Sequence, residues 1–154
     1  MIKLTNALWI GDSNDEVGAD LDSYGIGSIL NVAQDLQAVR GWLNNVEYAQ
    51  VGLIDGPGNT PAMYYAAVLV LHALLERNKV LVCCHTGGRS LAVAMMYLHG
   101  ADTVKWDEQI TEISKQLSPE VELPVPHESH KLAFERINWR LLTSLRRSST
   151  IMRE

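Results

Sequence analysis

Short apolar runs alternate along the chain with longer segments that have the composition of helices. The short runs have the length and apolar content of strands, and they cover residues 2–4, 7–10, 28–32, 46–54 and 80–82. The first two lie on either side of Thr5-Asn6 and predict a hairpin. A helical segment separates the last two, which predicts a crossover between parallel strands. We therefore predict an α/β fold: a single domain of three layers in which helices flank a central, mostly parallel sheet.

Helices are predicted where apolar residues recur at helical spacing or where a capping residue precedes them. The predicted helices cover roughly 15–24, 35–43, 60–78, 90–98, 104–117 and 128–145. Thr60-Pro61 is a typical helix start, because a hydroxyl residue caps the helix and proline fits its first position. The third helix is apolar on most sides and is expected to be buried. Its expected buried face consists of Met63, Ala66, Ala67, Val70, Leu71, Leu74 and Leu75.

Composition and charge narrow the class of protein. The 154 residues suffice for one domain with a proper core, predicted to span residues 1–146, followed by a flexible tail at 147–154. The formal net charge of −5 argues against a broad nucleic-acid surface. No apolar run reaches the roughly 20 residues of a membrane-spanning helix, and the amino terminus lacks the apolar stretch of a signal peptide. We therefore expect a cytoplasmic protein with no nucleic-acid or membrane partner.

Segment 80–90 carries the most informative chemistry. A predicted strand ends at Cys83, a loop with two glycines follows, and a helix begins near Arg89. Ligands in open α/β sheets bind outside the carboxyl ends of the strands, and the free N–H groups of a helix start attract anions. Gly87 and Gly88 let the backbone curl so that these N–H groups converge on one oxyanion. This pattern predicts a phosphate-binding loop.

Cys83 and Arg89 are separated by five residues, which is the C-x5-R spacing of cysteine phosphatases. The arginine offers a planar fork of donors to two phosphate oxygens, and with the helix start it favours the thiolate of the cysteine. We therefore predict that Cys83 is the nucleophile. The predicted phosphate-binding residues are Cys84, His85, Thr86, Gly87, Gly88 and Arg89. In the alternative interpretation both cysteines are buried packing residues and the arginine is a surface charge.

Asp55 is the candidate general acid. Attack of a thiolate on a phosphate ester needs a proton donor for the leaving oxygen, usually a carboxyl group on a neighbouring loop. Asp55 follows the predicted strand 46–54 and opens the flexible stretch 56–59, with one helix and one strand between it and Cys83. If the two strands are parallel neighbours joined by that crossover, their ends lie on the same side of the sheet. The alternative is an aspartate that merely starts a turn.

Four segments of the first hundred residues resemble the dual-specificity phosphatases, particularly the small atypical members of this branch of the protein tyrosine phosphatase superfamily. Residues 6–12 are similar to the family's opening segment p-x-L-Y-L-G-s, and residues 24–33 are similar to its strand G-I-t-h-V-L-N-V-a. Residues 48–55 match Y-x-x-I-P-V-x-D, whose last residue is the family's general acid, and residues 83–90 fall on its signature loop. After Gly100 the likeness fades to a general pattern of helices.

The resemblance implies a protein tyrosine phosphatase-like fold and a covalent phosphocysteine intermediate. Asp55 would protonate the leaving group and then activate water, Arg89 and the loop amides would hold the phosphate oxygens, and Ser90 would stabilise the departing thiolate. No cofactor and no metal are expected. His127 and His130 have a spacing compatible with metal binding, but no cysteine or carboxylate pattern completes a site around them.

Two positions depart from the family pattern. The family usually has His immediately before the cysteine, where this chain has Val82. It often has Gly three residues after the cysteine, where this chain has Thr86, a β-branched residue that limits the backbone angles. Both departures leave open a weaker activation of Cys83.

The predicted function is hydrolysis of phosphomonoesters, with phosphotyrosine or phosphoserine/threonine proteins as substrates. A catalytically weak phosphate-binding module is the alternative that Val82 and Thr86 motivate. A sulfurtransferase of the rhodanese kind also places a cysteine in an anion-binding loop, but persulfide transfer has no need for an acid such as Asp55. The sequence leaves open phosphoinositide, RNA 5′-end and nucleotide substrates, and the oligomeric state.

Overall fold

A five-stranded sheet runs through the computed structural model, which describes residues 1–13, 20–36, 45–120, 123, 126 and 128–132. In chain order the strands are β1 (Ile2–Lys3), β2 (Leu8–Gly11), β3 (Ile26–Ala33), β4 (Glu47–Leu53) and β5 (Lys79–Cys83). Their order across the sheet is β1-β2-β5-β3-β4. The β1–β2 pair is antiparallel and forms the predicted hairpin, whereas the other three pairings are parallel. The prediction of a central, mostly parallel sheet is therefore confirmed.

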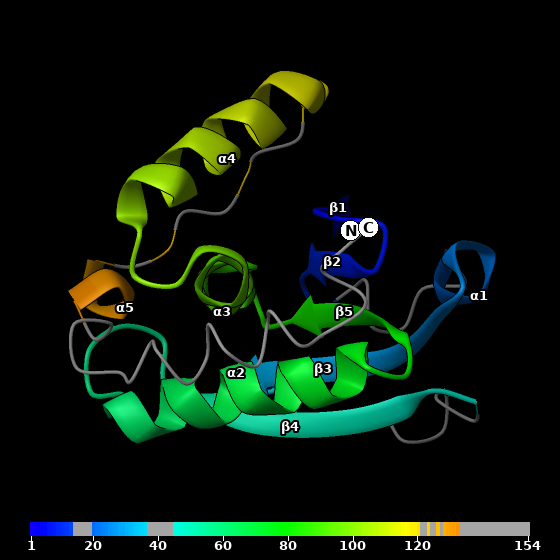
Figure 1. Cartoon of the computed structure of the whole chain (residues 1–154), viewed down its shortest axis with the longest axis horizontal. Helices are drawn as coiled ribbons and strands as arrows, with labels where there is room; N and C mark the ends of the chain where they lie inside the picture. The colour runs from blue at the N-terminus through cyan, green and yellow to red at the C-terminus, as the bar shows by residue number, and fades with distance from the viewer. Residues whose placement is uncertain (14–19, 37–44, 121–122, 124–125, 127, 133–154) are drawn as a thin grey trace.

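Helices cover both faces of this sheet (Figure 1). They are α1 (Asp20–Tyr24), α2 (Pro61–Leu75), α3 (Gly88–His99), α4 (Thr103–Gln116) and α5 (Glu128–Leu132). Residues of α2 and α3 form the larger buried cluster together with alternate strand residues. Leu21 of α1 belongs to a smaller cluster on the opposite face. Because α1 lies on one face of the sheet and α2 and α3 on the other, the sheet is the middle one of the predicted three layers.

The place of β3 in the sheet differs from the expectation. The strands that precede Asp55 and end at Cys83 were predicted to be neighbours, but β3 lies between β4 and β5 and pairs with both. All residues of β3 except Gly27 are buried, which is typical of a central strand covered on both faces. Because β3, β4 and β5 are all parallel, their carboxyl ends still meet at one edge of the sheet.

Successive side chains of β5 point to opposite faces of the sheet. Val80 and Val82 belong to the cluster formed with α2 and α3. Leu81 and Cys83 belong to the smaller cluster, which also contains Trp9. This is the period-2 alternation that the pleat of a strand imposes.

Helix α2 is rotated relative to the predicted buried face. Tyr64 and Val68 are buried although neither was assigned to that face, whereas Ala66 is exposed. The sequence contains apolar residues on nearly every side of this helix, so its periodicity alone does not fix the rotation. The buried side is determined by what the helix packs against, which is β3, β4, β5 and α3.

Several predicted segments fall partly or wholly outside the described residues. Only Asp20–Tyr24 of the first predicted helix and Glu128–Leu132 of the last are described as helix. Gln34 and Asp35 form a turn where the second helix was expected to begin, and residues 37–44 lie outside the described part. The tail predicted at 147–154 also lies outside it.

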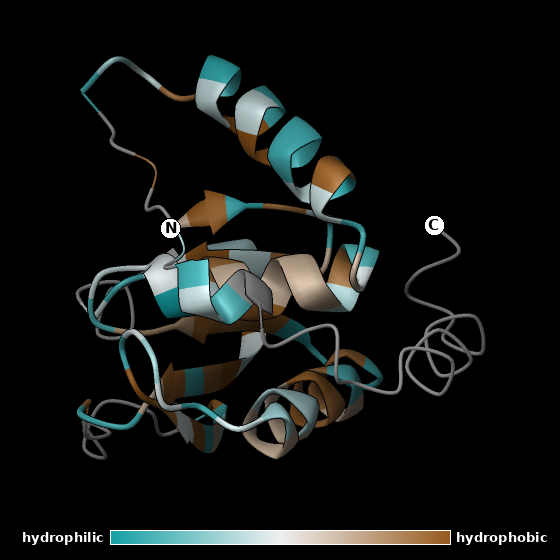
Figure 2. Ribbon diagram, turned by 90° about the vertical axis from the view of Figure 1, so that its left-hand side faces the viewer, coloured by the Kyte–Doolittle hydropathy of each residue, from teal (hydrophilic) through white to brown (hydrophobic). Residues whose placement is uncertain are grey.

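The colouring by hydropathy separates the sheet from its outermost helix (Figure 2). The strands are largely apolar, whereas α4 carries polar residues over much of its surface. Trp106 joins α4 to the core: it is fully buried, and its indole N–H donates to the carbonyl of Gly100 at 3.0 Å. None of the helices in the described part of the chain is long and apolar enough to cross a membrane.

Replacement of Trp106 by alanine should destabilise the protein by about 3–5 kcal/mol, because it leaves a large cavity under α4. Val104 lies on the same helix and is 65% exposed, so Val104→Ala is the matched control and should change stability by less than about 0.5 kcal/mol. Urea unfolding of both variants measures the difference. Equal losses would contradict the assignment of Trp106 to the core.

Candidate functional site

The cysteine loop, residues 84–87, connects the carboxyl end of β5 to the start of α3. Gly87 is the residue before the helix, and its φ of 92° lies in the left-handed region. Residues with a Cβ adopt this conformation at a cost of roughly 1–2 kcal/mol, so glycine is suited to this position. The loop therefore turns sharply and directs the first N–H groups of α3 back toward the end of β5.

The two cysteines lie on different sides of the sheet. Cys83 is the last residue of β5, and its side chain is buried in the cluster with Trp9. Cys84 is the next residue, and its side chain is buried in the cluster with α2 and α3. The sulfur of Cys84 accepts the backbone N–H of Gly87 at 3.1 Å and that of Ser90 at 3.4 Å.

These contacts make the Cys84 sulfur the acceptor for N–H groups at the beginning of α3. Such groups have no partner within the helix and carry a partial positive charge, so they favour a negatively charged acceptor. The Cys84 thiol donates to the hydroxyl oxygen of Ser90 at 3.6 Å. That hydroxyl lies 2.9 Å from the Gly87 carbonyl and 3.1 Å from the Gly11 carbonyl, and it can rotate to donate to the sulfur instead.

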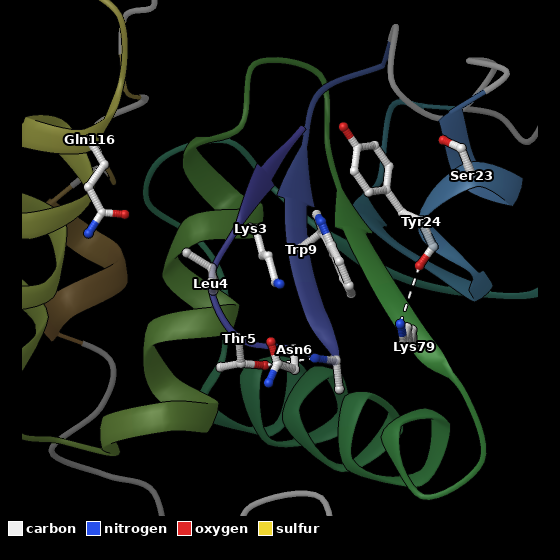
Figure 3. Close-up of a pocket in the computed structure, with 10 residues that line it drawn as sticks. Lys3, Leu4, Thr5, Asn6, Trp9, Ser23, Tyr24, Lys79 and Gln116 are labelled. Atoms are coloured by element: carbon white, nitrogen blue, oxygen red, sulfur yellow. Dashed lines mark hydrogen bonds between the residues drawn. The ribbon is translucent and has the colours of Figure 1, made fainter. Parts of the chain in front are cut away.

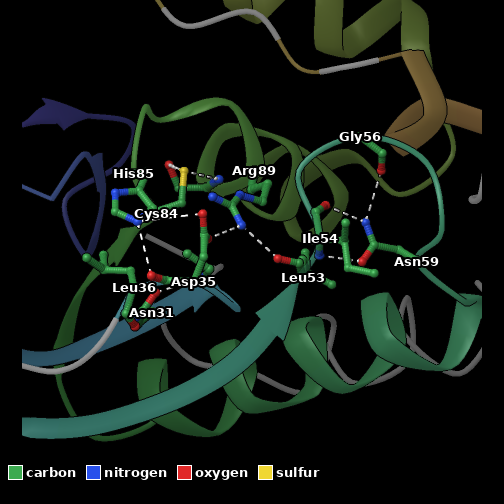
Figure 4. A network of polar contacts seen from close by, with 12 residues as sticks. Asn31, Asp35, Leu36, Leu53, Ile54, Gly56, Asn59, Cys84, His85 and Arg89 are labelled. Carbon is green, nitrogen blue, oxygen red and sulfur yellow. Dashed lines mark hydrogen bonds and ion pairs between the residues drawn. The ribbon is translucent and has the colours of Figure 1, made fainter.

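Arg89 is buried at the first turn of α3, with only 2% of its side chain exposed. Its Nη1 donates to the Asp35 carboxylate at 2.8 Å and to the Leu53 carbonyl at 2.7 Å (Figure 4). The guanidinium thus joins the start of α3 to the ends of β3 and β4. Within the described part of the chain both of its hydrogen bonds come from Nη1.

Asp35 lies at the rim of this site with 61% of its side chain exposed. The hydrogen bond from Arg89 is the main cause that holds the pKa of the Asp35 carboxyl below its ordinary value. His85 is the second basic group beside it: its Nε2 lies 3.6 Å from the Asp35 carboxylate and 3.2 Å from the Asp35 carbonyl oxygen. Two basic side chains of the segment 85–89 therefore face one carboxylate.

Asp55 lies in the acid loop, residues 54–59, which follows β4. The Asp55 side chain is exposed. Asp55 comes two residues after Leu53, whose carbonyl accepts a hydrogen bond from Arg89. Asn59 at the other end of the acid loop accepts the N–H of Ile54 at 2.7 Å and donates to the Ile54 carbonyl at 2.8 Å. The bond from Arg89 to the Leu53 carbonyl joins the end of β4 to the start of α3, which follows β5. The acid loop and the cysteine loop therefore lie at the same edge of the sheet.

The structure brings the backbone N–H groups of Gly87 and Ser90 to the sulfur of Cys84, while the Arg89 side chain is bonded to Asp35 and Leu53. His85 and Thr86 are exposed at the turn of the loop. The role predicted for Cys83 remains a prediction from its spacing to Arg89.

One feature of the sequence favours Cys84 over Cys83 as the cysteine of the signature loop. Gly87 stands three residues after Cys84, where the resembled family often has glycine, and this match is absent when Cys83 is taken as the reference.

Three polar residues of this edge were not assigned a role from the sequence: Asp35, Asn59 and Tyr64. Asp35 was expected to begin a helix, Asn59 belonged to the stretch 56–59 that was expected to be flexible, and Tyr64 lay in the predicted helix 60–78 outside its expected buried face. No motif marks any of them, because their contacts depend on how distant segments meet. Among the described residues no group of three or more His, Cys, Asp or Glu side chains has the arrangement of a metal site.

A cavity of about 890 Å³ lies near Lys79, where β5 begins, at the other edge of the sheet (Figure 3). The ammonium groups of Lys3 and Lys79 each lie 5.8 Å from the centre of the Trp9 ring beside it. The described residues that line this cavity include none of those predicted to bind phosphate. Cavity size therefore does not locate the candidate site, which is defined by the polar contacts around Cys84 and Arg89.

Asp35→Asn should unfold at a lower urea concentration than the wild type at pH 7, because it loses the charge that pairs with Arg89. Asp35 binds its proton more weakly in the folded protein than in the unfolded chain, so the stabilisation is complete above the ordinary carboxyl pKa of 3.8. It is lost as the pH falls through the lower folded pKa. Urea unfolding between pH 7 and pH 3 should therefore show the gap between the two proteins narrowing with acid. A gap that does not change with pH would contradict the ion pair.

The comparisons with known proteins give matches among solved structures alone. No protein-family model matches the chain, and no curated protein matches it. Human DUSP28 is 18% identical with a TM-score of 0.69, over 94% of this chain and 99% of that one. DUSP15 is 22% identical with a TM-score of 0.68, over 96% of this chain and 92% of that one. The human tyrosine phosphatase-like serine/threonine/tyrosine-interacting protein is 17% identical with a TM-score of 0.70, over 92% and 97%. The chain has the fold of the dual-specificity phosphatases.

Proposed function

We propose that the chain is a phosphomonoester hydrolase that works through a phosphocysteine intermediate on Cys84. The observation that carries the proposal is the set of hydrogen bonds from Gly87 and Ser90 to the Cys84 sulfur, at the start of the helix that also carries Arg89. Donors directed at a sulfur favour the thiolate, which is the nucleophilic form. Arg89, buried in the first turn of the same helix, supplies the planar donors that suit a phosphate.

Cys84 is proposed in place of Cys83 because of the face on which its side chain lies. A nucleophile assisted by the start of α3 must project to the side of the sheet that α3 covers, and the side chain of Cys84 belongs to that side. The assignment shortens the spacing to Arg89 from five intervening residues to four. It also puts Cys83, instead of Val82, at the position where the resembled family usually has His.

The first step forms a bond between sulfur and phosphorus. The Cys84 thiolate attacks the phosphorus atom, and the bond from phosphorus to the leaving oxygen breaks as that oxygen takes a proton from the Asp55 carboxyl group. The Nη2 and Nε groups of Arg89 and the N–H groups of the cysteine loop bind the oxygens that stay on phosphorus. The products of this step are the free alcohol or phenol and the phosphorylated cysteine.

The second step returns the enzyme to its starting form. Water attacks the phosphorus atom while the Asp55 carboxylate takes one of its protons, and the bond from sulfur to phosphorus breaks. The Ser90 hydroxyl, 3.6 Å from the Cys84 sulfur, rotates to donate to the departing thiolate. Inorganic phosphate leaves with the oxygen of the water, and Asp55 is protonated again for the next cycle.

Phosphotyrosine and phosphoserine/threonine proteins are the proposed substrates. The family resemblance supports this substrate class, and so does the fold shared with human DUSP28 and DUSP15. The net charge of −5 makes highly anionic polymers such as RNA less suitable, since the protein as a whole repels them. The reaction requires no metal or cofactor, because the thiolate is the nucleophile and a carboxyl group moves the proton.

A phosphate-binding module without turnover is the second candidate. Two observations favour it: the loop has four residues between Cys84 and Arg89, and the Nη1 of Arg89 is already bonded to Asp35 and Leu53. A shorter loop has fewer N–H groups to direct at an oxyanion. One of the matched structures bears the name of a phosphatase-like interacting protein, so the fold alone does not choose between the two candidates.

Cys84→Ser should lower the turnover of a chromogenic aryl phosphate by roughly 10³-fold or more, because a serine hydroxyl without an adjacent base is a poor nucleophile. Cys83→Ala is the matched control, since it removes the neighbouring sulfur and should keep activity within about 10-fold of wild type. Steady-state hydrolysis by both variants and the wild type measures the two effects.

The reverse order, with activity lost in Cys83→Ala and kept in Cys84→Ser, would return the nucleophile to Cys83. Binding of vanadate by calorimetry separates the two candidate functions. Micromolar binding to a folded wild type that shows no turnover would replace the hydrolase by the binding module.

A further inference from the structure

The side chain of Asn59 is bonded to both ends of the segment that carries Asp55. Its Oδ1 accepts the N–H of Ile54 at 2.7 Å, and its Nδ2 donates to the Ile54 carbonyl at 2.8 Å (Figure 4). The same Nδ2 lies 3.3 Å from the carbonyl of Gly56. The residues immediately before and after Asp55 are therefore held by one amide group.

Two glycines with positive φ give the backbone of this segment its conformational freedom. Gly56 is buried and has a φ of 98°, and a Cβ built on it would meet no atom within 4 Å. Gly58 has a φ of 113°, and residues that adopt such angles easily make a flexible chain. The hydrogen bonds of Asn59 therefore restrain a backbone that contains two glycines with positive φ.

Tyr64 connects this amide to the core. The hydroxyl of Tyr64 lies 3.2 Å from the Nδ2 of Asn59, and the tyrosine itself is buried in the first turns of α2. The same hydroxyl makes a hydrogen bond to Nδ1 of the buried His130 in α5. Asn59 is thus itself held in place, and a group held by the core can fix the loop that it contacts.

We propose that Asn59 is a positioning residue for the general acid: it holds residues 54–56 so that the Asp55 carboxyl meets the leaving oxygen. The inference rests on the proposed hydrolase function. The carbonyl of Leu53 accepts a hydrogen bond from Arg89 at 2.7 Å, which fixes the start of the segment relative to the arginine proposed to bind the phosphate. Asn59 fixes its continuation, so the acid and the arginine keep a constant separation. Positioning of this kind matters because proton transfer requires a heavy-atom distance of about 2.6–3.2 Å.

The dependence of the rate on the leaving group tests this role. General acid catalysis is worth roughly 10²–10⁴-fold for a basic leaving oxygen and far less for one that departs readily as an anion. Asn59→Ala should therefore lower kcat/KM by at least about 10-fold for phenyl phosphate and by less than about 3-fold for a nitrophenyl phosphate. A loss of fold or of phosphate binding would lower both rates together.

Asn78→Ala is the matched control variant. Asn78 is also a half-buried asparagine with side-chain hydrogen bonds, to Ser28 at 2.8 Å and to Glu47 at 3.3 Å, but it lies before β5 at the far edge of the sheet. Its replacement should leave the ratio of the two rates unchanged. Tyr64→Phe is a milder second variant, which keeps Asn59 and should change the ratio in the same direction by a smaller factor.

Amide hydrogen exchange supplies a readout that needs no turnover. The N–H of Ile54 should exchange at least about 10-fold faster in Asn59→Ala than in the wild type, because it loses its acceptor. An active wild type whose rate ratio is unchanged in both Asn59→Ala and Tyr64→Phe overturns the inference and leaves the proposed function standing. A folded wild type without turnover overturns the proposed function, and the role of Asn59 in catalysis with it. Unchanged exchange at Ile54 contradicts the inference in either case.

Discussion

The alternation of side chains along β5 decides which cysteine meets helix α3. Leu81 and Cys83 point to the face of the sheet that carries Trp9, whereas Val82 and then Cys84 belong to the face covered by α2 and α3. Because α3 begins on that second face, its first free N–H groups reach the sulfur of Cys84. A shift of one residue along a strand exchanges the two faces, so neighbouring cysteines have entirely different surroundings.

Arg89 extends the same arrangement to the other strands. A buried guanidinium is unfavourable unless its charge is paired, and Asp35 pairs it through Nη1, which also donates to the Leu53 carbonyl. Those two bonds also join the ends of β3 and β4 to the start of α3. In the proposed function the other donors of Arg89 bind phosphate, so the contacts that stabilise the buried arginine would also position it for the substrate.

The strands and helices were predictable because each has a local pattern. The apolar runs predicted β3, β4 and β5, and Thr60-Pro61 predicted the start of α2. The order of the strands was not predictable in the same way, since pairing depends on contacts between distant segments. The sequence of β3 did carry a signal for a central position, because it lacks the apolar–polar alternation of a strand with one exposed face.

The sequence located the loop of the candidate site, but it did not determine which cysteine meets the start of α3 or which side chains contact the loop. The glycines, Arg89 and Ser90 mark the loop in the sequence, and the structure places them at the start of α3. The spacing to Arg89 favours Cys83, whereas the position of Gly87 and the face of the strand favour Cys84. Asn59 belongs to no sequence motif. Its side-chain amide matters because it bonds both the N–H and the carbonyl of Ile54 and also the hydroxyl of Tyr64, and these contacts appear only in the folded chain.

The central claim is that the sulfur on the α3 side of the sheet is the reactive one. A crystal structure of the protein with vanadate, which mimics the five-coordinate phosphorus of the transition state, tests it most directly. We expect vanadium bonded to Sγ of Cys84, with its oxygens bound by Nη2 and Nε of Arg89 and by N–H groups of the cysteine loop. Vanadium bonded to Sγ of Cys83, or vanadate bound away from both cysteines, would contradict the account.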